Sequence, residues 1–224
     1  MRRHLSLDFR FLCFTDDARG LRPEVEVHPI PDFDVPPAWQ RTPWLKLALF
    51  REGLAGLSGQ SLFLDLDILI TGRMDDFFSF APGRPCIIHD WEKALQRLFR
   101  RHGEPGNSSV FRFESGSSGV ILDRFLAERE QALSQYRTVV DQRYLAEALG
   151  RDKAWWPSEW VVSFKRHCIP AFPLNLLVPP RLPPDARIVV FHGRPNPHEA
   201  LAGYRSGRPH RICRPAEWVG QHWR

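Results

Sequence analysis

The chain has 224 residues, of which 43% are hydrophobic and 25% charged, and its net charge at pH 7 is +5. This composition describes a globular protein with a sizeable core, made of one domain or one and a half. No apolar run reaches membrane-spanning length, and the start lacks the apolar segment of a secretory signal, which argues against a membrane span and against secretion. The four cysteines form no Cys-x-x-Cys pair, which argues against a zinc site. We therefore expect a cytoplasmic protein with reduced thiols.

The first part of the chain predicts two strands, a helix and a further strand. Residues 9–14 and 24–30 have the apolar pattern of strands, and turn-rich or proline-rich connections follow them. Thr42 and Pro43 are typical of a helix N-cap and first helical position. A core-facing stripe follows at helical spacing: Trp44, Leu47, Phe50 and Leu54. In the run 61–72, seven apolar residues surround two aspartates, which predicts a buried strand, central in a parallel or mixed sheet.

The second part of the chain alternates short strands with helices. A one-turn helix is expected at 74–78, strands at 86–88, 107–113 and 188–191, and helices at 92–101, 117–136 and 141–149. The segment 155–184 is rich in tryptophan and proline and shows little regular pattern. The alternation predicts an α/β fold with a single mixed central sheet flanked by helices.

The last residues, 201–224, are expected to form a basic tail on a domain of residues 1–200. Five arginines lie in this tail against a single acid, Glu217: Arg205, Arg208, Arg211, Arg214 and Arg224. A solvated chain end is the ordinary interpretation of such a run, and contact with phosphates or a membrane surface is the alternative.

The candidate functional site is centred on Asp65 and Asp67. Burying two carboxylates at the carboxyl end of a strand costs free energy unless another group compensates their charge. Ligands of open α/β sheets bind at this edge, and oxygen ligands of this kind suit a hard cation such as Mg²⁺ or Mn²⁺. The structural alternative is that the two aspartates cap the strand end, held by backbone N–H groups or an arginine.

Four motifs follow one another along the chain: Phe63-Leu64-Asp65-Leu66-Asp67, Asn107-Ser108-Ser109-Val110, Asp141-Gln142 and His192-Gly193. In this order they resemble the glycosyltransferases that use nucleotide sugars, and the nearest family is glycosyltransferase family eight. The resemblance spans residues 9–197. It implies the glycosyltransferase A-type fold, one mixed α/β sheet built from two abutting halves, and a retaining, manganese-dependent transfer.

The resemblance also implies how the donor diphosphate is held. Asp65, Asp67 and His192 would bind Mn²⁺ or Mg²⁺, and Gly193 would let the phosphate approach closely. The lysine that the family carries after the histidine is missing, and Arg194 is the expected substitute. His192 lies between an apolar strand and a glycine, so a purely structural role in a turn stays open.

Four further residues are implied on the sugar side of the site. Asn107 and Ser109 would lie beside the transferred sugar, although the family usually has glycine in place of Ser109. Asp141 would hydrogen-bond sugar hydroxyls, and Gln142 would lie close to the reacting carbon. An N-cap for Asp141 and a turn for Asn107 are the structural alternatives. Three tryptophans form either an acceptor platform or part of the core: Trp155, Trp156 and Trp160.

We expect a metal-dependent transferase that moves a hexose from a nucleotide-diphosphate sugar to an unknown glycan, lipid or protein acceptor. Nucleic acid is not an expected partner, and peripheral membrane contact through the basic tail is an open option. Residues 2–5 resemble the last turn of a helix, so we expect the fold to lack its first strand. The alternatives are a non-catalytic, truncated relative and a haloacid-dehalogenase-like phosphatase; Ile68 and Leu69 stand where those phosphatases continue with Gly-Thr.

Overall fold

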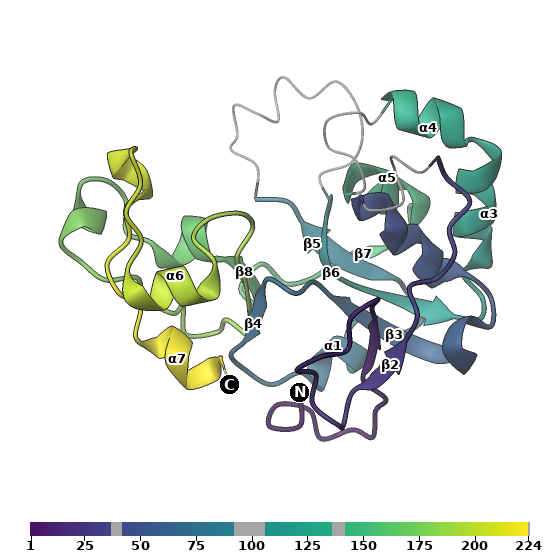
Figure 1. The fold of residues 1–224 in the computed structure, drawn as a ribbon, viewed down its shortest axis with the longest axis horizontal. Helices are drawn as coiled ribbons and strands as arrows, with labels where there is room; N and C mark the ends of the chain where they lie inside the picture. The colour runs from purple at the N-terminus through teal and green to yellow at the C-terminus, as the bar shows by residue number, and fades with distance from the viewer. Residues whose placement is uncertain (37–41, 92–105, 136–141, 224) are drawn as a thin grey trace.

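The computed structural model describes residues 1–36, 42–91, 106–135 and 142–223 (Figure 1). Two of the sequence-based expectations lie outside these residues: the helix at 92–101 and the position of Asp141.

The central sheet has four strands in the order β3-β6-β5-β7. These strands are β3 (Gly59–Leu64), β6 (Gly106–Ser115), β5 (Cys86–His89) and β7 (Ala154–Trp155). β6 is antiparallel to both β3 and β5, whereas β7 is parallel to β5, so the sheet is mixed. Helices flank it (Figure 1), which confirms the predicted α/β fold with a mixed central sheet.

Two smaller sheets accompany the central one. A three-stranded sheet has the order β4-β9-β8, with β4 (Ile68–Ile70) antiparallel and β8 (Val161–Ser163) parallel to β9 (Ile188–Val190). β1 (Leu12–Phe14) and β2 (Glu26–His28) form a two-stranded parallel ribbon. The single sheet expected from the sequence is therefore a principal sheet with two additions.

The prediction of one buried strand over 61–72 is wrong, because the chain changes sheet at the two aspartates. The amide of Asp65 makes the last ladder bond, to the Ser109 carbonyl at 2.9 Å. Leu66 is then 98% exposed, and the Asp67 carbonyl accepts a bond of 2.8 Å from the amide of Phe191, beside β4. Among the described strands, β3 pairs only with β6 and so lies at an edge of its sheet.

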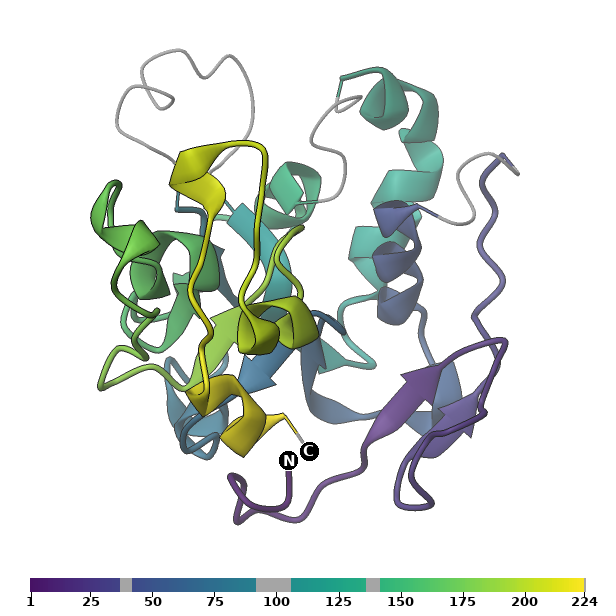
Figure 2. The same cartoon turned by 60° about the vertical axis from the view of Figure 1, so that its left-hand side comes forward.

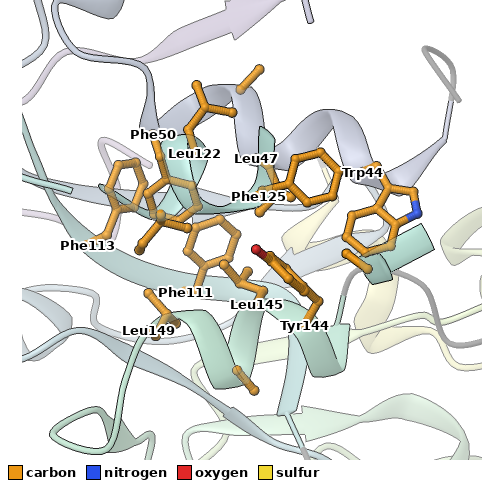
Figure 3. Close-up of a cluster of buried hydrophobic side chains, with 14 of the residues drawn as sticks. Trp44, Leu47, Phe50, Phe111, Phe113, Leu122, Phe125, Tyr144, Leu145 and Leu149 are labelled. Atoms are coloured by element: carbon orange, nitrogen blue, oxygen red, sulfur yellow. The ribbon is translucent and has the colours of Figure 1, made fainter. Parts of the chain in front are cut away.

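One face of the central sheet packs against helices (Figure 3). They are η2 (Pro43–Phe50), α3 (Gly119–Ala127), α4 (Arg129–Gln135) and α5 (Gln142–Ala148). η2 is a 3₁₀-helix: its buried residues Trp44, Leu47 and Phe50 are three apart, which puts them on one face when there are three residues per turn. The ring centroids of Trp44 and Phe125, in α3, are 4.9 Å apart, and those of Phe50 and Phe113, in β6, are 4.7 Å apart.

The other face packs against α1 (Asp76–Ser79), the one-turn helix expected near residue 76. Successive residues of a strand point to opposite faces, so Phe111 joins the helical side while Val110 joins this one. Arg112 is 2% exposed on this side. Its guanidinium donates to the carbonyls of Phe77 at 2.6 Å and of Ala81 and Arg84 at 2.8 Å, so the buried charge is solvated by the backbone.

The segment 155–184 is more regular than its composition suggests. Besides β8 it holds a π-helical turn, η4 (Phe164–Cys168), and a 3₁₀ turn, η5 (Leu174–Leu176). A further 3₁₀ turn, η3 (Leu54–Gly56), lies outside this segment and precedes β3.

Residues after 196 form α6 (Pro197–Ala202), η6 (Pro209–Arg211) and α7 (Trp218–His222). The boundary expected at residue 200 falls within α6, and Cys213, Ala216 and Val219 are buried in one core cluster with residues of β8 and β9. These residues are part of the fold and not a solvated tail. α7 lies beside the N-terminal segment (Figure 2), where the rings of His4 and His222 are 6.4 Å apart. No helix among the described residues is long and apolar enough to cross a membrane.

Candidate functional site

The two aspartates lie where the chain leaves the central sheet and enters the three-stranded sheet. Both side chains are half-buried. Burial and the neighbouring charge of Asp65 raise the pKa of Asp67 above its usual value. The junction therefore holds two interacting carboxylates that need a positive partner.

Lys46 from η2 supplies that partner for Asp65. Its Nζ lies 3.0 Å from Oδ1 and 3.1 Å from Oδ2 of Asp65, and donates to the Ser108 hydroxyl at 3.0 Å. It also lies 5.2 Å from the centre of the Phe63 ring. The side chains of Lys46 and Asp65 are only 16% and 24% exposed, so this ion pair is largely shielded from water. Sequence analysis did not identify Lys46.

The predicted sugar-side residues lie at an irregularity of β6. Ile87 of β5 pairs with Phe111, but the next residue, Ile88, pairs with Asn107, so residues 108–110 bulge from the ladder. Asn107 and Ser109 are each 4% exposed, and the Ser109 amide donates to Asn107 Oδ1 at 3.0 Å. Asn107 thus shapes the bulge, and the bulge presents Ser108 to Lys46. Bulges often redirect side chains next to active sites.

Gln142 begins α5 and lies next to the start of β6. A Cβ on Gly106 would lie 2.3 Å from that of Ala146 and 3.2 Å from the Gln142 carbonyl, so only glycine allows helix and strand to approach this closely. The approach brings the first turn of α5 to the Asn107 end of β6. Gln142 therefore lies close to the start of β6, two residues before the bulge.

His192 follows β9, and its side chain contacts Ser163 and Trp91. Its Nε2 shares a hydrogen bond of 2.6 Å with the Ser163 hydroxyl, and its ring stacks on that of Trp91 with centroids 5.7 Å apart. Burial, together with the charges of Lys165 and Arg166, lowers the pKa of His192 to about 4. The imidazole is therefore neutral at pH 7.

A second lysine that sequence analysis missed, Lys165, lies beside His192. Its Nζ donates to the His192 carbonyl and would lie 3.2 Å from a Cβ on Gly193. Burial lowers the pKa of Lys165, as do the charges of Arg211 and Arg166, while Asp67 is near enough to raise it. The ammonium therefore lies between the aspartate junction and the His192–Gly193 turn. The signal in the sequence was the basic run 165–167, directly after Phe164.

Arg194 does not take the place expected of it. Its side chain is 71% exposed, and its Nε lies 3.6 Å from a carboxylate oxygen of Glu199 in α6. Gly193 has a φ of +68°, a left-handed conformation that favours glycine, so the chain turns sharply after His192. The cation beside this turn comes from η4 and not from the residue that follows Gly193.

The expected manganese ligands do not form a metal site as they are arranged. Among the described residues, no group of three or more His, Cys, Asp or Glu side chains is close enough to hold a metal ion. Asp65 is paired with Lys46, and Nε2 of His192 is bonded to Ser163. As they are arranged, the Asp65 carboxylate and Nε2 of His192 therefore bond to protein groups in the place of a divalent cation.

No family model matches the sequence, and no curated protein matches it. Among solved structures, the chain is similar to the galactosyltransferase LgtC, whose crystal structure is a complex with donor and acceptor sugar analogs. The TM-score is 0.49, the sequences are 12% identical, and the match covers 86% of this chain and 79% of that chain. The likeness concerns the arrangement of the elements and is too loose to bear on the reaction.

Proposed function

We propose that this protein is a glycosyltransferase that moves a hexose from a nucleotide-diphosphate sugar to a glycan, lipid or protein acceptor. One observation supports the proposal most: residues far apart in the chain meet where the two sheets join. Asp65 and Asp67 lie at this junction, with Lys46 on one side and His192 and Lys165 on the other. Such a junction offers both anion-binding and hydroxyl-binding groups.

The departing nucleoside diphosphate gains negative charge as the glycosidic bond breaks, so a nearby cation stabilises the transition state. Lys165 is suited to this role, because its ammonium lies against the His192–Gly193 turn. A neutral His192 can in addition donate a hydrogen bond to a phosphate oxygen. The sequence predicted Mn²⁺ for this task; the present arrangement supports a lysine instead.

The carboxylates and the amide serve the sugar end of the donor. Asp67 is suited to accept hydrogen bonds from donor hydroxyls, and Gln142 to orient the sugar from the start of α5. Retention of configuration, which the family resemblance implies, requires no second carboxylate of the kind that retaining glycosidases use as nucleophile. Hexose specificity and retention are part of the proposal.

A non-catalytic protein that binds a nucleotide sugar is the second candidate. The observation in its favour is the Lys46–Asp65 pair, because Asp65 is already neutralised within the protein. The two candidates predict the same donor binding, and only turnover separates them.

The test is to incubate the protein with a panel of nucleotide-diphosphate sugars and to measure release of the nucleoside diphosphate. The proposal predicts release from one donor, reduced at least tenfold in Asp67→Asn and Gln142→Ala and unchanged in Asp123→Asn, an exposed aspartate of α3. Binding without release would favour the second candidate. If no donor binds or reacts, both are wrong.

A further inference from the structure

Three large apolar side chains project into solvent from one short segment. Phe172 is 58% exposed, Leu174 56% and Leu177 78%. The segment is anchored: Asn175 is 1% exposed, and its Nδ2 donates to the carbonyls of Pro209 at 2.9 Å and Ile212 at 2.8 Å. The three side chains are therefore held outward by a fixed turn, η5, rather than by a loose loop.

The surroundings of this segment are basic. Residues 164–182 and 203–216 contain seven lysines and arginines and no aspartate or glutamate. The basic residues are Lys165, Arg166, Arg181, Arg205, Arg208, Arg211 and Arg214, and all except Lys165 are exposed. The two bonds of Asn175 join η5 to η6, and the Arg181 amide bonds to the Cys168 carbonyl at 3.0 Å, so both stretches lie together. Figure 1 shows them in green and yellow at the end of the molecule away from β2.

We propose that this apolar–basic surface, formed by residues 164–182 and 203–216, docks on an anionic phospholipid bilayer. The arginines meet the phosphates of the lipid headgroups, while Phe172, Leu174 and Leu177 enter the boundary with the acyl chains. Lipid is favoured over nucleic acid because moving apolar side chains from water into hydrocarbon is favourable. A nucleic-acid backbone offers charged phosphates and no comparable apolar environment.

The surface borders the candidate site. Arg211 is near enough to Lys165 to lower the pKa of that lysine. Docking therefore brings the Lys165 side of the junction next to the bilayer. The docking itself does not depend on the proposed reaction and is tested separately.

The experiment is co-sedimentation of the protein with vesicles of phosphatidylcholine alone and of phosphatidylcholine mixed with phosphatidylglycerol. We expect binding to the mixed vesicles that weakens with added salt, and little binding to the neutral ones. Each arginine near an anionic surface strengthens partitioning about five-fold, so Arg205→Gln with Arg208→Gln should weaken it about 25-fold. Leu174→Gln with Leu177→Gln should weaken it by at least about tenfold.

Matched controls come from other parts of the surface. Arg19→Gln removes an arginine that is 91% exposed, and Val120→Gln an apolar side chain that is 69% exposed. Both should bind vesicles as the wild type does, and unchanged circular dichroism shows that all variants fold. Failure to bind the mixed vesicles, or equal binding by the leucine variant, would overturn the proposal. DNA binding that the arginine variant loses and the leucine variant keeps would assign the surface to nucleic acid instead.

Discussion

Replacing Lys46 with methionine removes the ammonium that lies 3.0 Å from Asp65 while keeping an unbranched side chain. Two unit charges at this separation attract each other by about 5 kcal/mol at an effective dielectric constant of about 20. Desolvation of two side chains that are 16% and 24% exposed offsets most of that attraction. We therefore expect a coupling free energy between Lys46 and Asp65 of about 1–3 kcal/mol.

The coupling is measured by urea denaturation of the wild type, Lys46→Met, Asp65→Asn and the double variant. The double-mutant cycle subtracts the contacts that Lys46 makes with Phe63 and Ser108, because these are lost in both arms. The control is the pair of Arg19 and Asp17, 2.6 Å apart with side chains 91% and 49% exposed, whose coupling should be much weaker because water screens it. A Lys46–Asp65 coupling no larger than this control would refute the view that Lys46 neutralises the aspartate.

Three further predictions concern the surroundings of the site. Gly106→Ala should lower the free energy of unfolding by about 1–3 kcal/mol, because the added Cβ would lie 2.3 Å from the Cβ of Ala146. Gly207→Ala is the control, because a Cβ at Gly207 would meet open space. Equal urea midpoints of the two variants would contradict the prediction. Asp67→Asn should raise the melting temperature at pH 7. The fold raises the pKa of Asp67, so ionisation of this carboxyl destabilises the folded state. The increase in melting temperature should therefore become smaller as the pH falls toward the ordinary pKa of 3.8. A lower melting temperature of Asp67→Asn at pH 7 would contradict this reasoning. Arg112→Leu should cost at least about 3 kcal/mol in urea denaturation, because it leaves three carbonyls without their donor; a near-neutral effect would show that water replaces the guanidinium.

The elements that sequence analysis predicted well are those whose own residues determine them. β5 and β9 are short apolar runs, residues 107–113 of β6 have a strand-like pattern, and the structure places strands at all three. The spacing in η2 predicted a helix but not its 3₁₀ type, because residues three apart share a face in both helix types. The change of sheet after Asp65 was missed, since an apolar run does not show which strands it pairs with.

The site was predicted in part for the same reason. Asp65, Asp67 and His192 were identified from motifs, and the structure places them around the junction of two sheets. Lys46 and Lys165 were missed because each meets its partner across the fold, 19 and 27 residues away in sequence. The C-terminal residues were predicted to be solvated because arginines dominate them, but Cys213, Ala216 and Val219 recur among those arginines and are buried. The cytoplasmic location stays a prediction.

The most direct test of the central claim is calorimetric titration of the wild type and Lys165→Ala with a panel of nucleotide-diphosphate sugars, in buffer with EDTA and in buffer with Mn²⁺. Arg194→Ala is the matched control, because Arg194 is turned toward Glu199. The account predicts that one donor binds the wild type and Arg194→Ala equally, even in EDTA, and binds Lys165→Ala at least tenfold more weakly. Donor binding that Lys165→Ala retains in full, or the failure of every donor to bind the wild type, would contradict it.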